Sequence, residues 1–132
     1  MKKQIITTNK APEPIGPYNQ AIKIDKMLFV SGQIPMTKSM ELIQNNLREE
    51  TKQVMENLNA ILKEADMNFD DVVKTSIFIN DMDNFEIINE EYGKYFRNGN
   101  EPARETVAVK TLPKNVRVEI SMIAYKGNWI KY

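Results

Sequence analysis

The spacing of apolar residues between Leu47 and Met67 predicts an amphipathic helix. Apolar and small residues recur there every three or four positions, and charged residues lie on the other faces. The recurring positions are Thr51, Val54, Met55, Leu58, Ile61, Leu62 and Ala65. Asn46 and Glu49 have the spacing of a capping box, with Asn in place of the usual Ser or Thr, and indicate where the helix begins. We expect this helix to cover one face of another element.

A second helix is predicted from about Asn84 to Arg97. Asp83 and Glu86 supply its start signal. Its apolar stripe consists of Phe85, Ile88, Tyr92, Tyr95 and Phe96. Gly99 and Pro102 follow, and both residues favour a break in the chain.

Alternation with a period of two predicts the strands, most clearly at 72–80, where Val73, Thr75, Ile77 and Ile79 share one face. Two short strands at 21–25 and 27–30 flank a turn at Asp25-Lys26, and two more are expected at 104–110 and 117–125. The preceding stretch 9–20 contains three prolines and a glycine, so it is expected to be a shaped loop. The order of strand, strand, helix, strand, helix, strand, strand favours an α+β fold with both helices on one face of a single sheet.

Alternation also assigns side chains to the two faces of the sheet. On the last strand Val118, Ile120, Met122 and Ala124 suit the helix side, and Arg117, Glu119, Ser121, Ile123 and Tyr125 then point the other way. On the strand before it, Val107 and Val109 suit the helix side, which puts Arg104, Thr106 and Ala108 opposite and sends Glu105 to the helix side. Arg104 and Glu119 are therefore expected to share the face that the helices leave uncovered.

That uncovered face is expected to be partly apolar. Phe78, Ala108, Ile123 and Tyr125 are placed on it beside the polar residues. An apolar sheet face that its own chain leaves open is usually covered by another subunit. The pattern therefore predicts an oligomer with charged residues in clefts between subunits.

Composition and charge narrow the classes of function. The 132 residues suit one domain, 1–132, and the formal net charge of zero gives no basic footprint for nucleic acid. No apolar run approaches the roughly 20 residues that span a bilayer, and Met1–Lys10 has no signal-peptide core, so the expected compartment is the cytoplasm. Because Cys and His are both absent, thiolate nucleophiles, Ser-His-Asp triads and the usual zinc hydrolase sites are excluded.

Two charged residues carry the candidate chemistry. The guanidinium of Arg104 matches a carboxylate, although a solvated Arg or an ion pair with Glu105 is the simpler interpretation of that residue alone. Glu119 stands in an apolar strand, where burial would raise its pKa and let it deprotonate a water. The alternative for Glu119 is an exposed Glu, or one paired with Arg117 or Lys74.

Weaker candidates surround these two residues. Tyr18 in the proline-rich loop can line a pocket or only pack the loop, and Ser31-Gly32 can offer backbone N–H groups or only make a turn. Asn89 can reach a cleft or bond locally. The acidic pairs Glu49-Glu50, Asp70-Asp71 and Glu90-Glu91 are interpreted as solvated faces, and no metal cluster or phosphate-binding glycine loop is present.

Taken together, the segments resemble the Rid (YjgF-type) family of reactive-intermediate deaminases. Six motifs occur in the family's order, and the resemblance covers nearly the whole chain. They are IGPYNQA at 15–21, FVSGQIP at 29–35, DVVKT at 71–75, NEEY at 89–92, PAR at 102–104 and VEI at 118–120.

This resemblance implies a chorismate-mutase-like mixed β-sheet with two helices packed on one face, in a trimer with a central β-barrel and sites between subunits. It implies that Arg104 binds the substrate carboxylate and that Glu119 positions the attacking water. Pocket residues would be Tyr18, Ser31, Gly32, Asn89 and Thr106, the last standing where many relatives have cysteine. Two departures bear on substrate range, namely Glu105 in place of a small residue and a short 36–46 loop without the family's glycines.

The implied reaction is hydrolysis of 2-iminobutanoate, 2-iminopropanoate or their enamines to 2-keto acids and ammonia, without metal or organic cofactor. A non-catalytic protein that binds a small keto acid in the same cleft is the alternative. An endoribonuclease, an activity reported for some relatives, is disfavoured by the zero net charge and the absence of His.

Overall fold

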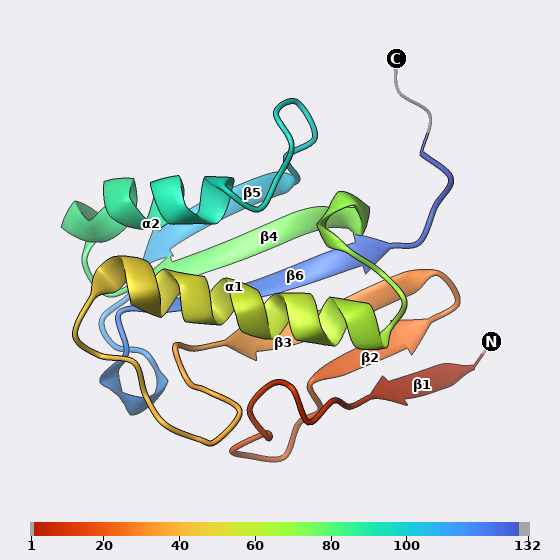
Figure 1. Cartoon of the computed structure of the whole chain (residues 1–132), viewed down its shortest axis with the longest axis horizontal. Coiled ribbons are helices and arrows are strands. Elements are labelled where there is room, and N and C mark those ends of the chain that lie inside the picture. Colours follow the sequence, from red (N-terminus) through yellow and green to blue (C-terminus); the bar gives the residue numbers. More distant parts are fainter. Residues whose placement is uncertain (1, 130–132) are drawn as a thin grey trace.

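The computed structural model describes residues 2–129 as a mixed sheet of six strands with two helices. The strands are β1 (Lys3–Ile6), β2 (Ala21–Ile24), β3 (Met27–Gln33), β4 (Val72–Ile79), β5 (Ala103–Ala108) and β6 (Val118–Tyr125). They lie in the order β1-β2-β3-β6-β4-β5, and only the β4–β5 pair is parallel. The helices α1 (Leu47–Glu64) and α2 (Phe85–Gly93) both lie on one side of the sheet (Figure 1). The α+β prediction with both helices on one face is confirmed.

Helix α1 forms as its pattern predicts. The side-chain oxygen of Asn46 accepts a hydrogen bond from the backbone N–H of Glu49 at 3.1 Å, which satisfies one of the unpaired N–H groups of the first turn. The apolar stripe faces the sheet and includes fully buried residues, namely Val54, Met55, Leu58, Ile61 and Leu62. Helix α1 thereby forms the centre of the main hydrophobic core.

Helix α2 is shorter than predicted. It begins at Phe85 and ends at Gly93, and the predicted start at Asp83 falls in a 3-10 helix, η2 (Met82–Asn84), which the side chain of Asp81 caps instead. Its stripe is nevertheless correct, because Ile88 and Tyr92 are buried against the core. Two further 3-10 helices, η1 (Phe69–Asp71) and η3 (Pro113–Asn115), precede β4 and β6.

The hairpin of β2 and β3 is confirmed, whereas β1 is a strand that the sequence pattern did not reveal. Asp25 has a φ of 52° in the two-residue turn between β2 and β3. Strand β1 is an edge strand in which only Ile6 is buried, so its sequence carries almost no alternation. Its pairing with β2 is decided by backbone hydrogen bonds, which the side-chain pattern does not encode.

The predicted alternation holds on β6 and, except at Val73, on β4. Val118, Ile120, Met122 and Ala124 are buried on the helix side. On β4 the register shifts between Val72 and Lys74, so Val73 is exposed and Val72 takes the buried position. The periodicity of β4 is therefore right for Thr75, Ile77 and Ile79 and wrong for Val73.

The face assignment of β5 is wrong, and this changes the site. Arg104, Thr106 and Ala108 pair with the buried residues Thr75, Ile77 and Ile79 of β4, so they point to the helix side. Glu105 and Val107 point to the open face instead. The reason is that β5 is an edge strand with both faces largely exposed, so burial does not select the positions of its apolar residues.

Each of the three acidic pairs contains one buried carboxylate, so their interpretation as solvated faces was wrong for the second residue of each pair. Glu50, Asp71 and Glu91 are buried, while the residue before each of them is not. Arg117 forms a bidentate ion pair with Glu50 of α1 and therefore points to the helix side, not to the open face as predicted. A buried carboxylate needs such a partner, because charge in an apolar core is otherwise costly.

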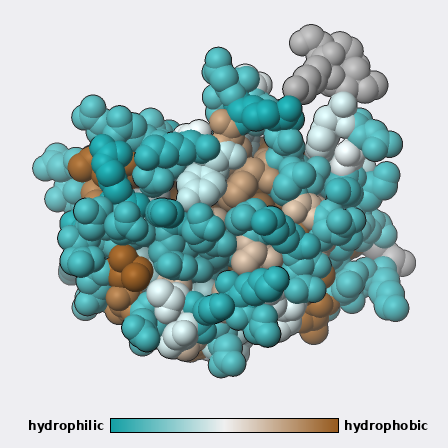
Figure 2. Space-filling model, viewed as in Figure 1, coloured by the Kyte–Doolittle hydropathy of each residue, from teal (hydrophilic) through white to brown (hydrophobic). Residues whose placement is uncertain are grey.

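The open face of the sheet carries the apolar surface that its pattern predicted. Phe29, Val107 and Tyr125 are 44%, 40% and 37% exposed on it, and Phe78 and Ile123 are half-buried. The helix side, by contrast, presents mainly hydrophilic atoms (Figure 2). No helix in residues 2–129 is long and apolar enough to cross a membrane. The assignment of 1–132 to one domain stays a prediction, since Met1 and residues 130–132 lie outside the described residues.

Candidate functional site

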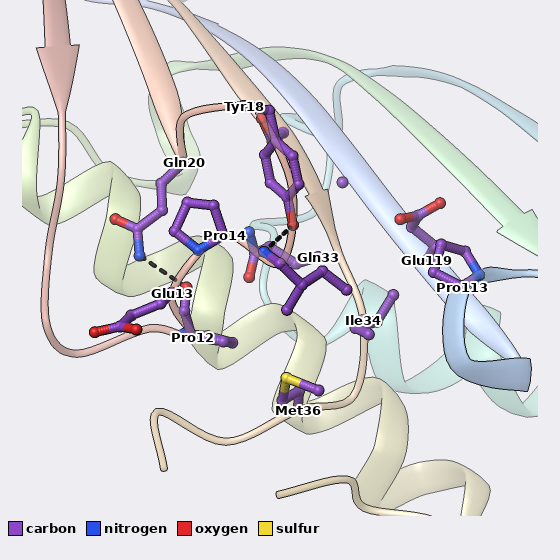
Figure 3. A pocket seen from close by; sticks show the side chains of 13 residues that line it. Pro12, Glu13, Pro14, Tyr18, Gln20, Gln33, Ile34, Met36, Pro113 and Glu119 are labelled. Carbon is purple, nitrogen blue, oxygen red and sulfur yellow. Dashed lines mark hydrogen bonds between the residues drawn. The ribbon is translucent and has the colours of Figure 1, made fainter. Parts of the chain in front are cut away.

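A cavity of about 310 Å³, here called the Glu119 pocket, lies between the proline-rich loop and the end of β3. Tyr18, Ser31, Gly32 and Glu119 all line this cavity, so four of the predicted site residues are brought together. Figure 3 shows Tyr18 rising from the loop on one side and Glu119 with Pro113 on the other. A small cleft with a few polar groups among apolar ones is the usual form of a ligand site.

The loop is held in place by the buried side chain of Gln20. Its amide oxygen accepts a hydrogen bond from the N–H of Thr8 at 2.7 Å, and its amide nitrogen donates to the carbonyls of Thr8 (3.1 Å) and Pro12 (2.9 Å). The hydroxyl of Tyr18 accepts a hydrogen bond from the N–H of Ile15 at 3.1 Å, which fixes the ring over the loop. The pocket wall is therefore preorganised by buried hydrogen bonds.

Ser31 and Gly32 form an irregularity in β3 that brings Glu119 close to the backbone. Val30 pairs with Met122 and Gln33 with Ile120, so two residues oppose the single residue between those partners, as in a β-bulge. A Cβ at Gly32 would lie 2.9 Å from the carboxyl carbon of Glu119. A larger residue at this position would therefore displace the Glu119 carboxyl from where it lies. Ser31 donates its hydroxyl hydrogen to the carbonyl of Asn19 at 2.5 Å, which ties the bulge to the loop.

Burial raises the pKa of the Glu119 carboxyl above its ordinary value. The pairing alternatives for Glu119 are wrong, because Arg117 pairs with Glu50 and Lys74 pairs with Glu105 at 2.7 Å. Among residues 2–129, no cation forms an ion pair with Glu119, so nothing offsets its desolvation. A half-buried carboxylate with a raised pKa is suited to accept a proton from a bound water near neutral pH.

Arg104 lies in a second cleft, here called the Arg104 pocket, beneath α2. Its Nη1 donates to Oδ1 of Asn89 at 2.6 Å, and its guanidinium carbon lies 5.6 Å from the ring centroid of Phe85 and 5.3 Å from that of Tyr92. These three residues of α2 are spaced at i, i+4 and i+7, so they form one face of the helix. The cleft measures about 440 Å³, and Asn89, Tyr92 and Arg104 line it.

The Arg104 guanidinium is thereby oriented while most of its donors stay free. Within the part of the chain that is described, its one hydrogen bond goes to Asn89, and Glu105 is engaged by Lys74. Cation–π contacts with two rings hold the planar group in one position. The remaining N–H groups can therefore bind a carboxylate in two-pronged geometry.

Thr106 lines neither pocket. Its hydroxyl is buried under the helix side of β5 and has no hydrogen-bond partner in residues 2–129, a property that it shares with the hydroxyls of Thr75 and Tyr92. The predicted pocket role of Thr106 stays a prediction.

The two pockets lie on opposite sides of the sheet within one chain. Glu119 pairs with Phe78, and Phe78 pairs with Val107, so Glu119 and Arg104 are separated by two strand spacings and three residues along β5. Those steps amount to about 14 Å between backbones, with the side chains pointing to opposite faces. The expectation that Arg104 and Glu119 share the open face is therefore wrong.

Sequence reasoning missed three residues of these pockets or in contact with Arg104, namely Gln33, Phe85 and Tyr92. Gln33 is buried and lines the Glu119 pocket. It lies inside the FVSGQIP motif at 29–35, so its position in that motif could have indicated a role in the site. Phe85 and Tyr92 contact Arg104, but their apolar spacing indicated only the helix stripe.

Comparisons with known proteins give a consistent result. The family model described as endoribonuclease L-PSP matches residues 8–126. A RutC family protein of Pyrococcus abyssi is 46% identical over 127 residues, covering 96% of this chain and 99% of the relative. A mouse protein named 2-iminobutanoate/2-iminopropanoate deaminase is 43% identical over 130 residues, covering 98% of this chain and 96% of the relative. The solved structure of a Rid family protein from Yersinia pestis superposes with a TM-score of 0.91 at 42% identity, covering 95% of this chain and all of the other.

Proposed function

The chain belongs to the endoribonuclease L-PSP family, which includes the Rid proteins, and we propose that it hydrolyses small 2-imino acids to 2-keto acids and ammonia. The mouse relative named as a 2-iminobutanoate/2-iminopropanoate deaminase supports this choice of reaction. The observation that carries the proposal is the pair of preorganised groups with complementary roles. One is a guanidinium with free donors, and the other is a carboxyl whose pKa is raised by burial.

The two pockets form one site only if they belong to different copies of the chain. Since the sheet separates Arg104 from Glu119 within a chain, each copy supplies half of a site to its neighbour. The exposed apolar residues of the open face give neighbouring copies a surface on which to assemble. A closed trimer, with the open faces turned inward as a barrel, would satisfy both requirements.

The reaction needs only orientation and proton transfer. Arg104 of one copy would bind the carboxylate of the imino acid, with the imine carbon near Glu119 of the other copy. Glu119 accepts a proton from water as the water oxygen adds to the C=N carbon, and the proton passes to nitrogen to give a carbinolamine. Glu119 then accepts the hydroxyl proton as the C–N bond breaks, and this proton leaves on ammonia as the C=O bond forms. Each proton is returned, so the step requires neither metal nor organic cofactor.

A second candidate is a protein that binds a keto acid without turnover. The observation that favours it is the completeness of the Arg104 pocket, in which Asn89, Phe85 and Tyr92 orient the guanidinium without any contribution from Glu119. The endoribonuclease in the family's description is the weaker candidate, because the chain carries 18 basic and 18 acidic residues and so lacks an excess of phosphate-binding charge.

The test replaces Arg104 and follows imine hydrolysis. An amino-acid oxidase generates the imine in place, and release of keto acid is measured for the parent, for Arg104→Ala and for the control Arg48→Ala, whose guanidinium makes an exposed pair with Glu90. We expect Arg104→Ala to lose about a hundredfold or more in kcat/KM and Arg48→Ala to stay near the parental rate. Parental hydrolysis by Arg104→Ala would refute the assignment. Binding of keto acid by the parent without faster hydrolysis would favour the second candidate.

A further inference from the structure

Gln33 is a buried polar residue whose side chain has no partner. It is 6% exposed, and its amide makes no hydrogen bond to any other described residue. A primary amide offers two donors and one acceptor oxygen. The amide atoms of Gln33 are not among the fully enclosed polar atoms without a partner in residues 2–129, so they stay open to a bound water or ligand. Gln33 lines the Glu119 pocket, so the exposed part of its side chain faces that cavity. Figure 3 shows it between Tyr18 and Ile34.

The rest of that part of the pocket is apolar. Its wall is formed by Pro12, Pro14, Ile15, Ile34, Met36 and Pro113. The cavity of about 310 Å³ is near the lower end of the range for small-ligand sites. Gln33 is thus a polar group beside these apolar residues, in a cavity that is also lined by the polar side chains of Glu13, Tyr18, Gln20, Ser31 and Glu119.

The wall beside Gln33 is fixed from behind by α1. The buried side chain of Asn57 donates to the carbonyls of Ile34 at 3.3 Å and Met36 at 2.8 Å, and it accepts from Gln53 at 2.8 Å. The backbone on which Gln33 is carried is therefore held by buried hydrogen bonds. This rigidity makes the position of the Gln33 amide a property of the fold, as a specific binding group requires.

We propose that Gln33 determines substrate specificity by binding the polar tip of the substrate side chain, so that imino acids with an amide-tipped side chain are preferred over apolar ones of similar length. This inference rests on the proposed function for the orientation of the substrate. With the carboxylate on Arg104 of one copy and the imine carbon near Glu119 of the other, the substrate side chain extends into the remaining cavity. Its methylene groups contact the apolar wall, and its terminal amide pairs with the amide of Gln33.

The physical basis of the preference is the asymmetry between polar and apolar recognition. An apolar pocket discriminates one methylene group by only about tenfold to a few hundredfold, whereas a site with a buried hydrogen-bonding group rejects a ligand that leaves this group unpaired far more strongly. An apolar side chain in this pocket would displace water from Gln33 and offer no replacement hydrogen bond. We therefore expect a preference of at least about tenfold for the amide-tipped substrate.

The test compares two imines in the parent and in a near-isosteric variant. Glutamine and norleucine are oxidised in place, and kcat/KM for keto-acid release is measured for the parent, for Gln33→Met and for the exposed control Gln44→Leu. We expect the parent and Gln44→Leu to favour the glutamine-derived imine by about tenfold or more, and Gln33→Met to lose or reverse this preference. A parent that favours the norleucine-derived imine would overturn the inference whether or not the variant folds.

A binding measurement separates this inference from the proposed function. Calorimetric titrations of the parent with glutaramate and with hexanoate compare an amide-tipped and an apolar carboxylate that do not react. If the parent hydrolyses no imine but binds glutaramate about tenfold more tightly, the proposed function fails and the role of Gln33 stands. If the parent hydrolyses imines but shows equal rates and equal affinities for the two classes, the role of Gln33 fails and the proposed function stands.

Discussion

Mixing two inactive variants tests whether the site is shared between copies of the chain. Arg104→Ala removes the proposed carboxylate anchor, and Glu119→Gln removes the proposed base without changing the shape of its side chain. Within one chain these residues lie about 14 Å apart at the backbone and on opposite faces of the sheet, so no small imino acid contacts both. Each variant alone should therefore be nearly inactive, although each keeps one pocket intact.

The two variants are denatured together in equal amounts, refolded and assayed for imine hydrolysis. A shared site is intact where one copy supplies Arg104 and its neighbour supplies Glu119. In a randomly mixed closed ring this occurs at about a quarter of the sites, so activity should recover to about a quarter of the parental value. Simple mixing of the folded variants should restore activity only as fast as subunits exchange. If the refolded mixture is no more active than the average of the two variants, the shared site is wrong.

Three further predictions concern single residues. Since burial raises the pKa of Glu119, imine hydrolysis should fall as the pH drops through that raised pKa. At pH values above the raised pKa, Glu119 is charged and burial of this charge destabilises the folded state. Glu119→Gln should therefore raise the Tm at pH 7, and a lowered Tm would contradict this. Gly32→Ala should place a Cβ against the Glu119 carboxyl and displace it. In steady-state kinetics we expect kcat to fall by about tenfold to a hundredfold with little change in KM, and an unchanged kcat would contradict this. Arg117→Ala should leave the buried carboxylate of Glu50 unpaired and lower the free energy of unfolding in urea by about 2–3 kcal/mol. The control Arg48→Ala, at an exposed pair, should lower it by about 1 kcal/mol or less, and equal losses would contradict the burial argument.

The exposure of β5 explains why the site was only partly predictable. The sequence named Arg104, Asn89, Glu119, Tyr18, Ser31 and Gly32, and in the structure each of them lines one of the two pockets. The sequence pattern assigned Arg104 to the wrong face, because β5 is an edge strand without a buried side, and burial therefore imposes no alternation on it. The contacts of Arg104 with α2 depend on the parallel register between β4 and β5, and a register between distant segments is a tertiary property.

The buried acidic residues show the same limit. Glu49 and Glu50 are chemically alike, and the sequence does not distinguish the exposed one from the one that pairs with Arg117. The separation between the partners is 67 residues along the chain, and only the packing of α1 against β6 brings them together.

The sequence by itself determined the local elements whose pattern a buried face imposes, namely α1, the stripe of α2, the β2–β3 hairpin and the alternation of β6. It also determined which chemistry the side chains can perform, because the absence of His and Cys leaves carboxylates, guanidinium groups, hydroxyls and amides. The tertiary structure alone decided which face Arg104 occupies, that Gln33 lies at a cavity without a hydrogen-bond partner in residues 2–129, and that the Glu119 and Arg104 pockets lie on opposite sides of one sheet. Local periodicity is set by burial of neighbouring residues, whereas these relations are set by strand order and register, which join segments far apart in the chain.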